Sequence, residues 1–130
     1  MLTKEQIKAK KDRKREWVPT PDWAPDDATL EQVAECGVWI GTMRGKARDL
    51  FEMESVSRRE ASADGEFEME GFKAFLITCC AENEDGSLMF DADDAEWLND
   101  KACGPLNDMF AVALRLNKLG KDDVEELRKN

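Results

Sequence analysis

Residues 71–81 read GFKAFLITCCA, the most apolar stretch of the chain. Its larger side chains recur at i, i+3, i+4, i+7 and i+8, the spacing of one helix face, and belong to Phe72, Phe75, Leu76, Cys79 and Cys80. Such a face needs cover from another element. Residues 106–116 repeat the same spacing. We therefore expect two helices that pack together around a common core.

A third helical pattern covers residues 45–58, with an apolar side and a charged side. The predicted core takes the face positions of the three segments: Leu50, Phe51, Phe72, Phe75, Leu76, Leu106, Phe110 and Leu114. A chain of 130 residues with 42% hydrophobic content is long enough for one such core and too short for two comfortable domains.

Two short segments favour β structure. Residues 17–25 read WVPTPDWAP, and three prolines in this space exclude a helix and suit an extended edge segment. Residues 36–43 read CGVWIGTM, an apolar run between glycines that is typical of a strand and could pair with the first segment. The predicted fold class is α+β, mainly α: a single small helical domain with a short two-stranded β element.

Charge divides the chain into an arm and a body. Residues 1–16 hold seven Lys or Arg and three acids, a net charge of +4, whereas the other 114 residues hold 12 basic and 26 acidic side chains, or −14. Thr3 and Gln6 predict a capped helix over residues 3–14. We divide the chain into a basic N-terminal helix or arm, 1–16, and a helical domain, 17–130, with a proline-rich insertion at 19–38. The arm could fold back on its own molecule or reach an acidic neighbour in an oligomer.

Several function classes are disfavoured. The acidic body disfavours nucleic acid, and no apolar run of about 18 residues indicates a membrane span. Without histidine or a CxxC pair we expect no metal and no cofactor, and without a nucleophile and base set we expect no enzyme. Cys79 and Cys80 are interpreted as core thiols in preference to redox groups, and the many carboxylates as a solvated surface.

The partner-binding surface is expected on parts of the chain whose side chains have few local partners. These are the basic arm, the aromatic segment and a predicted last helix at residues 122–129. For the two tryptophans, an aromatic docking surface competes with simple cover of the core. The candidate residues are Lys8, Lys11, Arg15, Trp17, Trp23, Val124 and Leu127.

Four blocks, in order, resemble tail assembly chaperones of long-tailed, siphovirus-type bacteriophages. They are MLTKEQIKAKKDRK (1–14), MRGKARDLFE (43–52), EDGSLMF (84–90) and LNDMFAVALRLNKLGKDDVEELRKN (106–130). The resemblance covers the first 15 residues and most of residues 40–130, and its most specific part is residues 113–130. The chain departs from the family pattern between residues 19 and 38, where the proline-rich, acidic insertion replaces two tightly joined strands.

The resemblance implies a protein without enzymatic activity that is made in the host cell cytoplasm and is absent from the mature virion. It implies that the protein keeps the helical tape-measure protein soluble while tail-tube subunits polymerise around it. A longer form, made by ribosomal frameshifting near residue 129, would then tie the chaperone to the tail-tube or the tape-measure protein. A homo-oligomer is a separate expectation, which comes from the basic arm and the acidic body and not from the resemblance.

Two other functions remain open on the residues alone. The first is a small acidic regulatory or adaptor protein that acts through its basic N-terminal arm. The second is an acidic mimic of DNA that occupies a nucleic-acid-binding protein. Binding to the tape-measure protein, set against binding to nucleic acid at several salt concentrations, distinguishes these functions.

Overall fold

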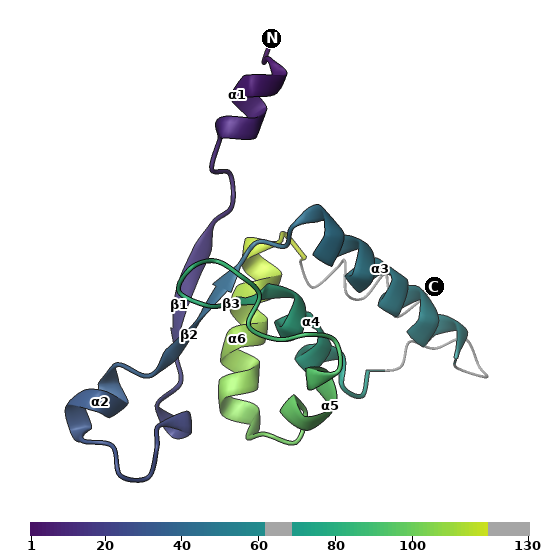
Figure 1. The fold of residues 1–130 in the computed structure, drawn as a ribbon. Helices are drawn as coiled ribbons and strands as arrows, with labels where there is room; N and C mark the ends of the chain where they lie inside the picture. The colour runs from purple at the N-terminus through teal and green to yellow at the C-terminus, as the bar shows by residue number, and fades with distance from the viewer. Residues whose placement is uncertain (62–68, 120–130) are drawn as a thin grey trace.

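A computed structural model describes residues 1–61 and 69–119. Figure 1 shows the described chain as a small body of helices beside a short sheet, with the N-terminal helix projecting from the body. The elements are α1 (Lys4–Ala9), β1 (Arg15–Pro19), η1 (Pro21–Trp23), α2 (Leu30–Ala34), β2 (Gly37–Gly41), α3 (Gly45–Glu60), α4 (Phe72–Cys80), β3 (Ala81–Glu82), α5 (Asp94–Leu98) and α6 (Cys103–Leu116). The α+β class and the single small domain are confirmed.

The sheet is antiparallel, in the order β1-β2-β3. The predicted pairing of the Trp17 region with the second strand is confirmed, with Trp17 opposite Trp39. The prediction of only two strands is wrong, because Glu82 and Ala81 pair with Trp39 and Ile40 on the other side of β2. Two residues are too few to show an alternating pattern, so the third strand had no signature in the sequence.

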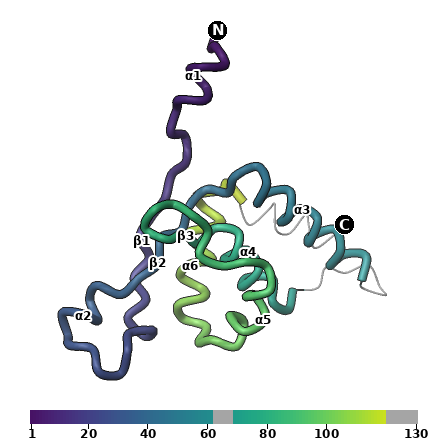
Figure 2. The backbone as a smooth tube through the Cα atoms, viewed as in Figure 1, coloured from purple at the N-terminus to yellow at the C-terminus, as the bar shows by residue number. Residues whose placement is uncertain are grey.

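The insertion between β1 and β2 forms a short excursion from the sheet. Figure 2 shows the backbone leaving β1, passing through α2 and returning to β2 at the same end of the strand pair. Thr29 accepts a hydrogen bond from the backbone of Gln32, and the Gln32 side chain bonds back to Thr29, which makes a capping box at the start of α2. The insertion therefore lengthens the connection without breaking the strand pair.

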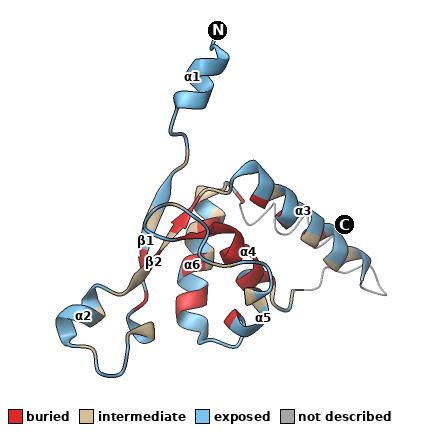
Figure 3. Ribbon diagram, in the orientation of Figure 1, coloured by how far each residue is buried: buried red, intermediate tan, exposed pale blue. Residues whose placement is uncertain are grey.

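The central helix α4 is buried on almost all sides (Figure 3). It packs against α3, α5, α6 and the sheet. A helix that is apolar all round lies in a core, and here Ala74, Ile77 and Thr78 are covered together with the predicted face. Gly71 precedes the helix with φ of 77°, a conformation that glycine adopts without strain.

The predicted core is confirmed at five positions and wrong at one. The five buried residues are Phe51, Phe72, Phe75, Leu76 and Leu106. Phe110 and Leu114 are half-buried and pack against the core. Leu50 is 49% exposed, because Ala47, Phe51 and Ser55 form the buried side of α3 and Leu50 lies on another side.

The N-terminal helix is shorter than predicted. Its capping box between Thr3 and Gln6 is present, but α1 ends at Ala9, and Lys10 is already extended. Arg15, which sequence reasoning assigned to the arm, begins strand β1. The backbone must therefore leave the helical conformation early to enter the sheet.

Helix α6 ends in a Schellman motif. Lys118 has φ of 56°, and the backbone N–H of Leu119 donates to the carbonyl of Leu114 at 2.8 Å. At the other end, Pro105 is the third residue of α6 and not the first. Proline has no backbone N–H, and the first turn tolerates it because an N–H at this position would have no acceptor within the helix. The predicted helix stop at residue 120 lies outside the described residues.

Candidate partner-binding surface

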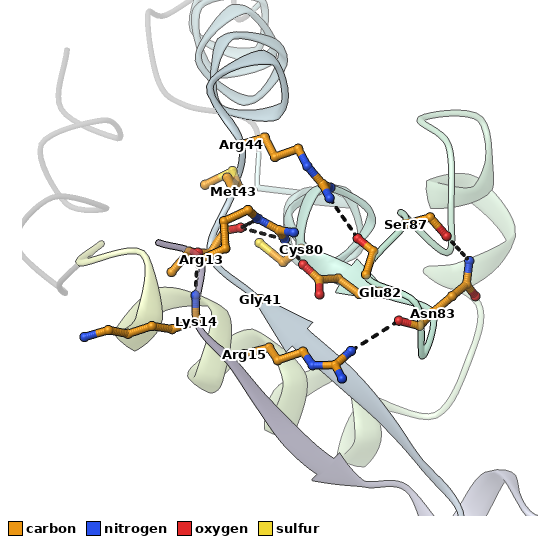
Figure 4. Close-up of polar contacts among 12 residues, drawn as sticks. Arg13, Lys14, Arg15, Gly41, Met43, Arg44, Cys80, Glu82, Asn83 and Ser87 are labelled. Carbon is orange, nitrogen blue, oxygen red and sulfur yellow. Dashed lines mark hydrogen bonds and ion pairs between the residues drawn. The ribbon is translucent and has the colours of Figure 1, made fainter. Parts of the chain in front are cut away.

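The arm is fixed to the body through Arg13. Its Nε and Nη2 atoms donate to the carbonyl of Thr42 at 3.2 and 3.1 Å, and its guanidinium forms an ion pair with Glu82 (Figure 4). The Glu82 carboxylate is only 2% exposed, so the ion pair neutralises a buried charge. The same carboxylate explains why residue 41 is glycine, since a β-carbon at this position would lie only 2.8 Å from Cδ of Glu82.

Arg15 also contacts the body of its own chain. Its Nη1 donates to the carbonyl of Glu84 at 3.0 Å, and its guanidinium lies 4.1 Å from the centre of the Trp39 ring. The indole of Trp39 in turn donates to the Glu84 carboxylate at 2.9 Å. This predicted partner-binding residue therefore has an intramolecular role.

The contacts of the arm form one wall of an open cleft of about 590 Å³. Arg44 closes one side by donating to the carbonyl of Gly86 at 3.0 Å. Carboxylates of Asp12, Glu84 and Asp85 stand among the cations. Because both signs of charge are mixed along the cleft, it is not a dedicated site for an anion.

The two tryptophans of the predicted docking surface have different roles. Trp17 is partly exposed and makes an edge-to-face contact with Trp39, their ring centres 5.2 Å apart. Trp23 is half-buried and packs against the core. Trp23 thus covers the core, whereas part of the Trp17 ring stays at the surface.

The remaining predicted residues are not brought together with these. Lys8 lies on α1 and Lys11 in the connection to β1, and both are exposed. Val124 and Leu127 lie outside the described residues, as does the predicted helix that holds them. The structure therefore joins Arg15 and Trp17 in one strand and does not gather the predicted set into one surface.

Helix α1 is exposed on every side. It contains no buried residue, and Ile7 is 61% exposed. Figure 1 shows α1 projecting away from the rest of the described chain. A six-residue helix is marginally stable in water without packing. Because Leu2 and Ile7 are exposed, these apolar side chains are available to a partner that would stabilise the helix.

The largest feature that sequence reasoning missed is the α3 outer face. We use this name for five exposed residues of α3: Asp49, Leu50, Met53, Val56 and Glu60. Met53 is 66% exposed and Val56 is 45% exposed. Contiguous exposed apolar side chains mark interaction surfaces more often than scattered ones do.

A small apolar cavity of about 160 Å³ lies at the N-terminal end of this face. Its lining consists of the uncharged side chains Ala47, Leu50, Cys79 and Leu88 and the cations Arg13, Arg44 and Lys46. The cavity has room for part of an apolar side chain from a partner. The cations in its lining favour a partner segment that carries acids.

The paired thiols belong to the core. Cys79 and Cys80 are buried in α4. Burial raises the pKa of Cys79 to about 11 and that of Cys80 to about 12. A thiol of such high pKa is almost wholly protonated at neutral pH and is a poor nucleophile. This state agrees with packing and not with redox chemistry.

Among residues 1–61 and 69–119, no helix is both long and apolar enough to cross a membrane. The same residues contain no group of three or more Cys, Asp or Glu side chains placed to hold a metal ion. No protein-family model, no curated protein and no solved structure matches the chain.

Proposed function

We propose that this protein is a tail assembly chaperone of a long-tailed bacteriophage, which binds the tape-measure protein and keeps it soluble until tail-tube subunits surround it. The observation that carries the proposal is the α3 outer face. Its apolar residues Leu50, Met53 and Val56 are exposed, whereas the other side of α3 is buried in the core. Among the described residues, no part of the chain buries these side chains.

The chemistry of this face suits an amphipathic helix. Met53 and Val56 are three positions apart and so lie side by side on the helix surface. Methionine is unbranched and adapts its shape to different partners. A tape-measure protein presents apolar helical stripes before the tube covers them, and a helix face of this kind can cover one stripe at a time.

Charge accounts for the solubility of the complex. The chain carries a net charge of −10, and Asp49 and Glu60 frame the apolar residues of the face. Complexes that carry many such copies along one client repel one another and remain dispersed. This function needs no catalytic residue and no cofactor.

The other parts of the proposal follow from the family resemblance. The chaperone acts in the host cytoplasm, is not retained in the virion, and recruits tail-tube subunits, with a longer frameshifted form as the link. The adaptor function stays as the alternative, and α1, whose Lys4 and Lys8 are exposed, is the element that would perform it.

Co-expression with the tape-measure protein encoded beside the gene tests the proposal. The wild-type chain should carry the tape-measure protein into the soluble fraction and purify with it. The double variant Met53→Lys with Val56→Lys should lose this ability. The control is Leu30→Lys, which removes a still more exposed apolar side chain from α2. Equal solubilisation by the two variants would refute the role of the α3 outer face.

A chain lacking residues 1–9 separates the two functions. The chaperone proposal predicts that this chain still binds the tape-measure protein, because the α3 outer face is unchanged. The adaptor alternative predicts that it loses its partner.

A further inference from the structure

Strand β1 stands at the end of the sheet. In the order β1-β2-β3 only β2 pairs with it, and Figure 1 shows it as the outermost strand. The outer edge of such a strand carries backbone N–H and C=O groups that no neighbouring strand takes up. Among the described residues, β1 therefore offers a free edge to another extended backbone.

The hydrogen bonds at the two ends of β1 show which residues face this edge. The carbonyl of Lys14 accepts from the N–H of Thr42 at 2.9 Å, and the N–H of Thr20 donates to the carbonyl of Cys36 at 3.0 Å. Along a strand the backbone groups of successive residues point to opposite edges. The even-numbered residues of β1 therefore bond β2, and the odd-numbered residues face the free edge.

The groups on the free edge define a short binding site. Arg15 and Trp17 each present an N–H and a C=O, whereas Pro19 presents only a C=O because proline has no N–H. Alternating donors and acceptors at strand spacing match an added β-strand, whose main chain supplies the complementary groups. Pro19 ends the row of donors, so the site is confined to the first part of β1.

The ring of Trp17 gives this site an apolar contact. It is 38% exposed and stands edge-to-face against Trp39, with the ring centres 5.2 Å apart. Residues directly opposite each other in neighbouring strands share one face of the sheet, so a residue placed opposite Trp17 would lie against its ring. Aromatic and β-branched side chains form the most favourable pairs of this kind.

The chain that leads into β1 is basic. Residues 10–15 contain five cations and one acid, Asp12. Arg13 pairs with Glu82, and Arg15 bonds the segment after β3. Among the described residues no ion pair involves the other three cations, all exposed: Lys10, Lys11 and Lys14. Three unpaired lysines against one acid favour an acidic partner at this end of the free edge.

We propose that the free edge of β1 binds an extended acidic segment of a partner protein, which joins the three-stranded sheet as a fourth strand. Its backbone bonds Arg15 and Trp17, and one of its β-branched or aromatic residues packs on the Trp17 ring. Its acids lie beside the three unpaired lysines. A second copy of the chain is a poorer occupant, because it would bring a second basic segment to the same edge.

This site goes beyond the proposed function. It lies on the sheet and not on the α3 outer face, and it takes an extended backbone and not a helix. Binding at one surface can therefore be lost while binding at the other remains.

Amide hydrogen exchange, followed by NMR on the full chain, reads the free edge directly. Without a partner, the N–H groups of Arg15 and Trp17 should exchange faster than that of Val18, which bonds β2. The probe is a synthetic peptide of about seven residues, an ordinary strand length, in which Val and Thr alternate between a pair of glutamates at each end. At saturating peptide, exchange at Arg15 and Trp17 should slow by at least about tenfold, and exchange at Val18 should stay the same.

Two altered peptides are the controls for the probe. The first carries N-methyl groups on all inner amides, so it cannot add as a strand. The second carries lysines in place of the glutamates, so like charges meet at the basic end of the edge. Each should bind at least about tenfold more weakly than the probe.

A matched pair of variants tests the edge from the side of the protein. Arg15→Pro and Arg15→Ala lose the same side chain, but only proline also removes the N–H that faces the free edge. An edge strand tolerates proline where its N–H faces solvent, so both variants should fold, which equal melting temperatures would show. Arg15→Ala should still bind the probe, and Arg15→Pro should bind it at least about tenfold more weakly.

Several results would overturn the proposal. They are exchange at Arg15 and Trp17 that the probe leaves unchanged, equal binding of the N-methylated peptide, equal binding of the lysine peptide, and equal binding by the two variants. Slower exchange at the same two amides on raising the protein concentration without peptide would identify a second copy as the occupant and would also overturn it. None of these results depends on the tape-measure protein, so the proposed function stands or falls separately.

Discussion

The backbone N–H of Met43 donates a 2.7 Å hydrogen bond to Oδ1 of Asn117, which lies 74 residues further along the chain. The amide of Asn117 also donates to the carbonyl of Ala113 at 2.9 Å. One side chain thus joins the end of α6 to the segment that leads from β2 into α3. It holds α3 in position relative to the core.

Replacing Asn117 with Ala should lower the free energy of unfolding by about 1–3 kcal/mol, because the N–H of Met43 loses its partner in a partly buried place. Asn107→Ala is the control on the same helix, since Asn107 is exposed and bonds only Lys73 among the contacts described. Urea denaturation measures both. Equal losses would mean that the Met43 contact contributes nothing of its own.

Truncation of Phe72 and of Leu50 compares a buried core position with an exposed position that the sequence pattern had placed in the core. Phe72→Ala should cost about 3–5 kcal/mol, because the ring is fully buried against Phe51 and Phe110. Leu50→Ala should change stability by about 0.5 kcal/mol or less, as expected for an exposed side chain. Thermal unfolding of the two variants decides, and a large loss at Leu50 would contradict its position on the α3 outer face.

Burial of the Glu82 carboxylate makes its partner important. Arg13→Ala should destabilise the protein by about 3 kcal/mol, the lower end for loss of one partner from a buried pair, because Arg13 itself reaches solvent. Adding Glu82→Gln should recover part of the loss, since a neutral amide is easier to bury. Arg48→Ala, which breaks the exposed pair with Glu52, should cost about 1 kcal/mol or less. Similar losses for both arginines, measured by urea denaturation, would exclude a special role for Glu82.

The high thiol pKa values predict a loss of stability in alkaline solution. In the unfolded chain each thiol has its ordinary pKa of 9.0, whereas the folded values are about 11 for Cys79 and about 12 for Cys80. Their contribution is complete below pH 9 and is lost as the pH rises toward the folded values, because only the unfolded chain readily gives up these protons. Urea midpoints from pH 8 to 11 should fall more steeply for the wild type than for Cys79→Ala with Cys80→Ala. Parallel curves would show that burial does not hold the protons.

The parts of the fold with local signatures could be predicted from the sequence. The apolar pattern around Phe75 marked the central helix, and the Thr3 capping box marked the start of α1. The strand that contains Trp39 was bounded by glycines. Strand β3 and the ion pair between Arg13 and Glu82 could not be predicted, because both depend on contacts between distant residues.

The candidate site was harder to predict than the fold. Helix α3 carries two apolar patterns, one with Phe51 on the buried side and one with Met53 on the outer side. Sequence reasoning took Leu50 together with Phe51 because neighbouring residues on a helix share part of a face. The continuation from Leu50 to Met53 and Val56 was the available signal for a second stripe. The cluster of basic residues in the arm gave a clearer pattern, yet Arg15 forms its hydrogen bond within its own chain.

Photo-crosslinking inside infected cells tests the proposed chaperone function most directly. A photoreactive amino acid is placed at position 53 on the α3 outer face or, as the control, at position 30 on α2. The chaperone function predicts adducts from position 53 that contain tape-measure peptides by mass spectrometry, and none from position 30. Adducts from position 53 that lack tape-measure peptides, or equal adducts from both positions, would contradict it.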